Sequence, residues 1–159
     1  MKNRSKESGV VLVEAIVVAS ILLIVATGLI FANIAYITSA SFTLSSTKAT
    51  FLAQEGVEVV KYIRTSGWED GIENLTDGTT YYLSFSPTAW ATTTTQEIVD
   101  GKFYRSFVVE EVLRDVNDDI ASSGTADSNT KKLTVDVSWL GKTGTTTRTI
   151  QTYITNFLE

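Results

Sequence analysis

One carboxylate, Glu14, stands alone in the apolar N-terminal part of this sequence. It is the only charged residue between Val10 and Thr47, and residues 10–37 are dominated by Val, Ile, Leu and Ala. An unpaired charge at the centre of a bilayer costs about 2.5 to 3.5 kcal/mol on insertion scales, so such a carboxylate needs a cationic partner. The chemistry expected at Glu14 is therefore ion pairing with a group that the intact apolar segment does not carry.

Cleavage of the peptide bond between Gly9 and Val10 would supply that group. The new amino terminus of Val10 would be a positive charge about one helical turn from Glu14. A neighbouring copy displaced axially by that turn could pair its own Glu14 with this amine, and other displacements would leave buried charges unpaired. We therefore predict processing at Gly9 and Val10 and an assembly role for Glu14. The alternative is that Glu14 simply extends toward lipid headgroups.

The residues on either side of Gly9 have opposite character. Residues 1–9 carry a net charge of +2 and the remainder −7, within a total of −5. A short basic segment stays on the cytoplasmic side of a membrane. The apolar run, residues 10–37, is longer than the roughly 20 residues that a helix needs to cross a bilayer. It is also longer than the apolar region of an ordinary secretory signal, which has about 7 to 15 residues. We predict a leader of residues 1–9 followed by a single membrane-spanning helix, residues 10–37.

Helical periodicity continues through residues 38–66 with one apolar face. Gly67, in the sequence TSGW, suits the left-handed conformation that ends a helix. Gly28 interrupts the apolar half, either as a tolerated membrane-helix glycine or as a weak point that can melt. The apolar residues of the amphipathic half recur at three- and four-residue steps: Ala49, Leu52, Gly56, Val59, Val60 and Ile63.

Residues 67–159 have the composition of a β-rich domain. We expect strands at 78–86 and 102–116, a loop at 91–96, and a terminal antiparallel hairpin in KKLTVDVSWLGKTGTTTRTIQTYITNFL, turning at 140–144. Trp139 alternates in phase with the core positions of that hairpin, whereas Trp90 falls in the expected loop and is a candidate adhesive residue. The fold class predicted is α+β: a sheet of three or four strands covered by the apolar face of the helix.

Composition argues against most other chemistry. The chain has no cysteine and no histidine, which removes disulfides, thiolates and the commonest general base, so we expect no enzyme and no cofactor. Asp115, Asn117 and Asp119 have the spacing of a calcium loop, but Ile120 replaces its glycine and a solvated acidic turn is favoured.

Five cations of the β-rich part were weighed as a nucleic-acid patch, and a mixed solvated face is favoured because the domain is acidic. They are Lys102, Arg105, Lys131, Lys132 and Arg148.

A basic leader, Gly9, an apolar run and Glu14 at the fifth following position together resemble the class III signal of type IV prepilins. A long helix with a β-rich C-terminal domain resembles the type IV pilin fold, and AQEGVEVVKYIRTSGW with the closing hairpin resembles minor pilins. The resemblance implies cleavage after Gly9 by prepilin peptidase, a membrane aspartyl protease, and methylation of Val10. It also implies passage from the bacterial cytoplasmic membrane into an extracellular filament, assembled with other pilin subunits by a platform protein and an ATPase.

Two further interpretations fit the same sequence. A pseudopilin of a type II secretion system shares all of these motifs. A surface adhesin or receptor that keeps its N-terminal anchor and never polymerises would leave Gly9 uncut and Glu14 without a role. A filament could serve adhesion, motility, DNA uptake or secretion.

Overall fold

The computed structural model describes residues 4–142 and 144–156, with side chains from residue 9 onward. The first three residues of the expected leader and Phe157 of the expected last strand lie outside the described residues. The chain divides into two units, Met1–Leu44 and Ser45–Glu159, called here the stem unit and the head unit. The elements in chain order are α1 (Arg4–Thr65), η1 (Glu69–Glu73), β1 (Tyr81–Ser86), β2 (Ala89–Thr93), β3 (Ile98–Val99), β4 (Phe103–Arg114), β5 (Ile120–Ala121), β6 (Thr125–Gly141) and β7 (Gly144–Thr155).

The described part of the stem unit is helical throughout, which confirms the helix predicted from residue 10 onward, and the helix also includes residues 4–9 of the expected leader. It contains a stretch of α1 long and apolar enough to cross a membrane. The hydroxyls of Ser20, Thr27 and Thr38 each donate to a backbone carbonyl one turn earlier, at 2.7 to 3.0 Å. These bonds satisfy the hydroxyls within the helix itself. The helix is unbroken at Gly28, where an added Cβ would meet nothing within 4 Å.

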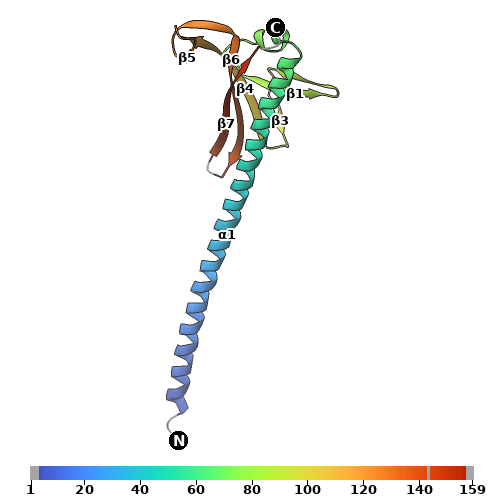
Figure 1. Cartoon of the computed structure of the whole chain (residues 1–159). Helices are drawn as coiled ribbons and strands as arrows, with labels where there is room; N and C mark the ends of the chain where they lie inside the picture. Colours follow the sequence, from blue (N-terminus) through green and yellow to red (C-terminus); the bar gives the residue numbers. More distant parts are fainter. Residues whose placement is uncertain (1–3, 143, 157–159) are drawn as a thin grey trace. The chain divides into compact units, whose positions relative to one another are not determined.

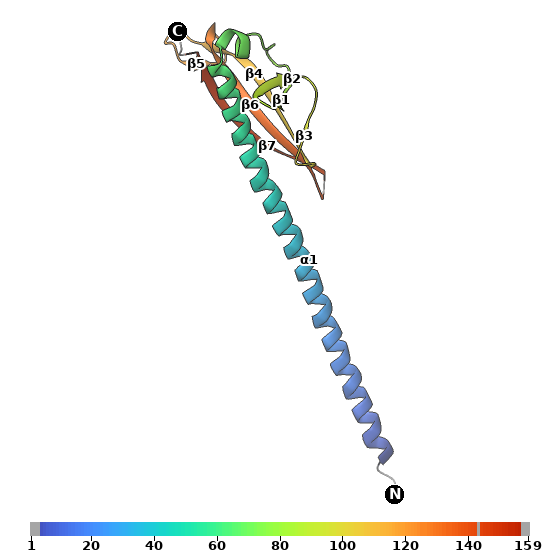
Figure 2. The same cartoon turned by 90° about the vertical axis from the view of Figure 1, so that its right-hand side faces the viewer.

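The head unit has two layers, a seven-stranded sheet and the C-terminal turns of α1 across one of its faces (Figure 1). All strand pairs are antiparallel, and the main path runs β2-β1-β4-β6-β7. The short strands β3 and β5 pair with the two ends of β4. Figure 2 shows the long β6–β7 hairpin beside these turns of the helix. An α+β layout with an N-terminal helix and a C-terminal antiparallel sheet is therefore confirmed.

The terminal hairpin lies where the sequence predicts it. β6 and β7 pair from Thr130↔Thr155 to Gly141↔Gly144, and the turn between them falls within the predicted residues 140–144. Trp139 is 1% exposed and lies in phase with the buried side chains of β6. Its assignment to the core is confirmed.

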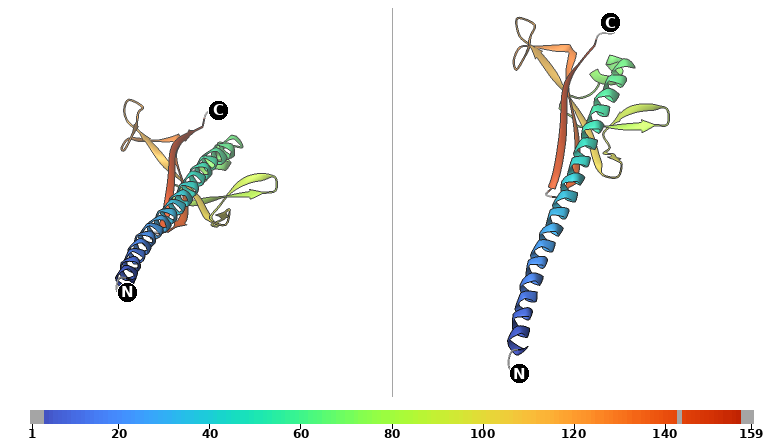
Figure 3. Two further views of the ribbon diagram at one scale, coloured as in Figure 1. Left: turned by 90° about the horizontal axis from the view of Figure 1, so that it is seen from below. Right: turned by 60° about the horizontal axis from the view of Figure 1, so that its bottom comes forward.

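The sheet is larger than predicted, and the predicted loop at 91–96 is wrong in its first half. Residues 91–93 belong to β2, which pairs with β1 in the register Leu83↔Thr92 and Ser84↔Ala91. Threonine is β-branched and favours strands, so this Thr-rich stretch pairs once a neighbouring strand offers its hydrogen bonds. The hairpin of β1 and β2 and the segment around β5 extend from the sheet in opposite directions (Figure 3).

The apolar face of α1 covers the sheet as predicted. The helix lies close to the sheet at Gly56, because a Cβ added there would lie 2.9 Å from Cγ1 of Val135 and 3.2 Å from Cδ of Arg105. The helix ends at Thr65, and Gly67 then adopts a φ of 147°, a positive value that favours glycine. The buried helix residues are Ser45, Ala49, Leu52, Ala53, Gly56, Val57, Val59, Val60 and Ile63.

Candidate functional site

The predicted processing residues lie within α1 in the stem unit. Gly9 is exposed, and a Cβ added to it would meet nothing within 4 Å. A glycine inside a helix is about 1 kcal/mol less favourable than alanine, so the Gly9–Val10 bond lies at a point where the helix unwinds more readily. No packing contact within the described chain requires a glycine at position 9. A requirement for glycine there would therefore come from a second protein that binds this segment.

Glu14 lies five residues beyond Gly9 and is also exposed. Within the part of the chain that the structure describes, it makes no hydrogen bond or ion pair. A shallow hollow runs along its face of the helix, and small side chains let another helix approach such a face closely. The residues that line the hollow are Val11, Glu14, Ala15, Val18, Ala19 and Leu22. The arrangement leaves Glu14 available to a second chain along a face suited to helix packing.

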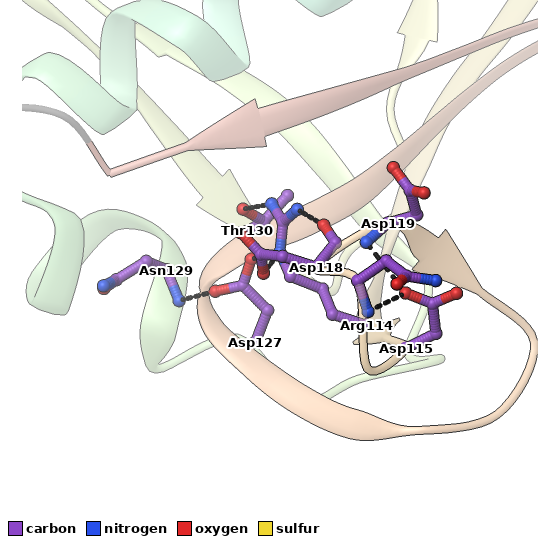
Figure 4. A network of polar contacts seen from close by, with 8 residues as sticks. Arg114, Asp115, Asp118, Asp119, Asp127, Asn129 and Thr130 are labelled. Atoms are coloured by element: carbon purple, nitrogen blue, oxygen red, sulfur yellow. Dashed lines mark hydrogen bonds and ion pairs between the residues drawn. The ribbon is translucent and has the colours of Figure 1, made fainter.

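The acidic turn of the head unit is organised around Arg114 (Figure 4). Arg114 Nε donates to Oδ2 of Asp127 at 2.6 Å, and its Nη1 donates to the carbonyl of Asp118 at 2.7 Å. Oδ1 of Asp115 accepts the backbone N–H groups of Asn117 at 2.8 Å and Asp119 at 3.1 Å.

The three residues with calcium-like spacing thus make a local turn closed by backbone amides. Among residues 4–142 and 144–156, no three acidic side chains gather as metal ligands. The sequence analysis missed the pairing of Arg114 with Asp127, because the β4–β6 connection brings together residues that have no local periodicity.

Two carboxyl groups of this turn have shifted pKa values. The hydrogen bond from Arg114, with a second from Thr130, lowers the pKa of Asp127 below its ordinary value. The amides of Asn117 and Asp119 lower the pKa of Asp115 in the same direction. Both groups are therefore ionised at neutral pH, where they stabilise the turn.

Each of the five cations considered for a nucleic-acid patch has a partner in the head unit. Arg105 is buried and its Nη1 pairs with Oε2 of Glu55 at 2.8 Å. Lys131 and Lys132 are adjacent in a strand and therefore point to opposite faces of the sheet. Their Nζ atoms pair with Asp77 and Glu110, each at 2.9 Å, and Arg148 donates to the hydroxyl of Ser46.

A groove in the head unit is the feature that the sequence analysis did not foresee. It lies between the C-terminal turns of α1 and the β1–β2 hairpin, with a volume of about 370 Å³. Trp90, expected in a loop, is half-buried in β2 and lines this groove together with Glu55, Glu58, Val59, Tyr62, Phe85, Thr88 and Ala89. The spacing of residues 55, 58, 59 and 62 on one helical face was the available clue. We call this feature the aromatic groove.

Comparison with known proteins adds no assignment, since no family model, no curated protein and no solved structure matches the chain.

Proposed function

We propose that this chain is a type IV pilin-like structural subunit, made as a prepilin and assembled into an extracellular filament. In this proposal prepilin peptidase cuts after Gly9, and the mature chain begins at Val10. The stem unit is the membrane helix before assembly and part of the filament core afterwards. The head unit is carried on the filament surface.

The observation that carries the proposal is the isolation of Glu14 on an otherwise apolar helix. From Val10 to Thr47 it is the sole charge, it has no partner among the described residues, and it lies in a shallow hollow that includes the small residues Ala15 and Ala19. A carboxylate kept in such a place needs a cation from outside its own segment. The amine of a processed Val10 on a neighbouring copy is a cation that a polymer would bring to that depth.

The head unit suits an exported structural subunit for a second reason. Its core is closed without any cysteine, by packing of the α1 face on a sheet whose central strands bury Phe107, Val109, Leu133, Val135 and Val137 at no more than 1% exposure. Such a core is independent of the redox state of the compartment into which it is moved.

Mass spectrometry of the full chain isolated from its native cells tests the proposal. The expected N-terminus is Val10, carrying a methyl group if the resemblance extends to that step. A functional chain that retains residues 1–9 would contradict the proposal and support the anchored adhesin instead.

Substitution of Gly9 by valine tests the processing step. A side chain at position 9 meets nothing in the described chain, so the expected loss of the mature form would reflect the protease alone. Gly28→Val is the matched control, because that position is equally open within the same helix and lies away from the cleaved bond. Equal processing of both variants would argue against specific recognition of Gly9.

Substitution of Glu14 by glutamine, or by alanine, tests the assembly step. Removing one partner of a buried ion pair costs about 3 kcal/mol, which corresponds to roughly 100-fold weaker association of subunits. We expect normal membrane insertion and normal processing with little or no filament. Thr27→Val, which removes a hydroxyl already satisfied within the helix, should assemble normally. Filaments at the wild-type level from Glu14→Gln would refute the pairing.

A further inference from the structure

The aromatic groove of the head unit has a preformed apolar wall. The ring of Trp90 lies 5.0 Å from that of Phe85, in a tilted arrangement. Cζ of Arg105 lies 5.5 Å from the Trp90 ring centroid, and Arg105 itself is held by Glu55. Trp90 is therefore held by contacts with two neighbours. Phe85 and Tyr62 remain 59% and 54% exposed, so the wall presents aromatic surface that nothing in the head unit covers.

The rim of the groove on the helix side carries two carboxylates, each already paired with one cation through one of its oxygens. Arg105 engages Oε2 of Glu55, and Lys61 engages Oε1 of Glu58 at 2.8 Å. The second oxygen of each carboxylate makes no hydrogen bond with the described residues. Carboxylate oxygens beside exposed aromatic rings recognise a cation on an apolar stem, through charge-assisted hydrogen bonds and cation–π attraction. The groove is therefore suited to bind a lysine-like group that has an apolar neighbour.

The same chain offers such a group at the end of the β6–β7 hairpin. Leu140 is 75% exposed there, and Lys142 follows it two residues later, also exposed. Among the side chains that the structure describes, Lys142 is the lysine without a hydrogen bond or ion pair. The partners of the others are Asp100 for Lys48, Glu58 for Lys61, Ser45 for Lys102, Asp77 for Lys131 and Glu110 for Lys132.

We propose that the aromatic groove of one copy receives the Leu140–Lys142 tip of a second copy. Leu140 packs on the aromatic wall, and the ammonium group of Lys142 reaches the rim carboxylates Glu55 and Glu58. Each surface lacks what the other supplies: the groove has uncovered rings and free carboxylate oxygens, and the tip has an uncovered apolar side chain and an unpaired cation.

The contact joins two different surfaces of the chain, which makes it heterologous. A heterologous contact leaves one groove and one tip free at the ends of any pair, so it repeats and yields an open helical array or a closed ring. The inference rests on the proposed function, because it names the surface by which head units of consecutive filament subunits recognise each other.

Carbodiimide cross-linking of the full-length chain tests the contact directly. This reagent joins a lysine amine to a carboxylate that it touches, with loss of water and no spacer. Cells are shifted from ¹⁵N to unlabelled medium during expression so that their membranes or filaments contain both labelled and unlabelled copies, and the cross-linked peptides are sequenced by mass spectrometry. We expect mixed-isotope peptides that join Lys142 to Glu55 or Glu58. Lys142 joined only within its own chain, joined to a different protein, or joined to neither glutamate would overturn the proposal.

A charge exchange provides a second, independent test. The chain has no cysteine, so chains with Thr88→Cys in the groove and chains with Thr145→Cys, paired with Leu140 across the hairpin, can be co-expressed without background. We expect a mixed disulfide between them. Lys142→Glu on one chain or Glu58→Lys on the other should each lower its yield at least fivefold, and both together should restore it.

Glu73→Lys is the matched control for the charge exchange, since Glu73 is exposed and does not line the groove. It should leave the disulfide yield unchanged. Equal effects of Glu73→Lys and Glu58→Lys, or no rescue by the exchanged pair, would overturn the proposal.

The two proposals fail in different ways. A processed chain that forms filaments without the Lys142 cross-link would remove this contact and leave the proposed function standing. A chain that retains residues 1–9 but shows the cross-link would contradict the proposed function. The contact between the groove of one copy and the tip of another would then join membrane-anchored copies.

Discussion

Replacing Gly56 by alanine tests how closely α1 lies against the sheet. The added Cβ would lie 2.9 Å from Cγ1 of Val135, about 0.6 Å short of the roughly 3.5 Å at which carbon atoms begin to attract. Val135 is fully buried on a central strand and cannot turn away. Overpacking of this kind costs about 1 to 3 kcal/mol, while alanine regains about 1 kcal/mol of helix propensity over glycine.

We therefore expect Gly56→Ala to lower the free energy of unfolding of the head unit by about 1 kcal/mol, or its Tm by about 4 °C. Urea unfolding of the full chain in detergent, followed by tryptophan fluorescence, is a suitable assay because Trp68 and Trp139 are buried. The result is made specific by Val135→Ala, which removes the atom that the new methyl group meets.

In the Val135→Ala background the 2.9 Å contact is gone, and only the 3.2 Å approach to Cδ of Arg105 opposes the gain in helix propensity. Gly56→Ala should therefore become stabilising there, by less than about 1 kcal/mol, and the two substitutions should be coupled by up to about 2 kcal/mol. Stabilisation by Gly56→Ala in the wild-type background, or additive effects of the two substitutions, would refute the close approach of helix and sheet at this point.

Two further predictions concern the charges of the head unit. Glu55→Gln should lower the free energy of unfolding by about 2 kcal/mol, since it leaves the buried guanidinium of Arg105 without its carboxylate. Glu58→Gln breaks only an exposed pair, so it should change the free energy of unfolding by less than about 0.5 kcal/mol in the same urea titration. The lowered pKa values of Asp115 and Asp127 stabilise the fold above the unfolded-state value of about 3.9, and this contribution is lost as pH falls below it. Tm measured from pH 7 to pH 3 should therefore drop at the acid end. Asp127→Asn should flatten that drop and lower Tm at pH 7. An unchanged dependence of Tm on acid pH in the variant would contradict the stabilising role of the Asp127 carboxylate.

The elements predicted correctly are those with a repeating local pattern. The apolar face of α1 recurs at helical spacing over several turns, and β6 alternates buried and half-exposed residues from Leu133 to Trp139. Both patterns survive folding because each element buries a single face. The strands that were missed, β2, β3 and β5, have two to five residues each and no pattern long enough to be distinguished from a loop.

The ion pair of the buried Arg105 also could not be predicted from local patterns. Arg105 lies in phase with Phe103 and Phe107 on the buried face of β4, yet its partner Glu55 is fifty residues away on α1. The sequence shows an arginine among core positions but not the carboxylate that neutralises it. The aromatic groove is unpredictable for the same reason, since it depends on where the β1–β2 hairpin lies against the helix. The roles predicted for Gly9 and Glu14, by contrast, depend on sequence spacing alone, and they stay predictions.

The internal hydroxyl bonds of the stem unit bear on how such a subunit would change its surroundings. Ser20, Thr27 and Thr38 already donate to carbonyls of their own helix. Their hydroxyls therefore need no further hydrogen-bond partner either in lipid or in a bundle of neighbouring helices. On the proposed function, withdrawal from the bilayer would break none of these bonds, and re-entry would require none to form. Glu14 differs from them, because its carboxylate has no partner among the described residues and would gain one only where another chain supplies a cation.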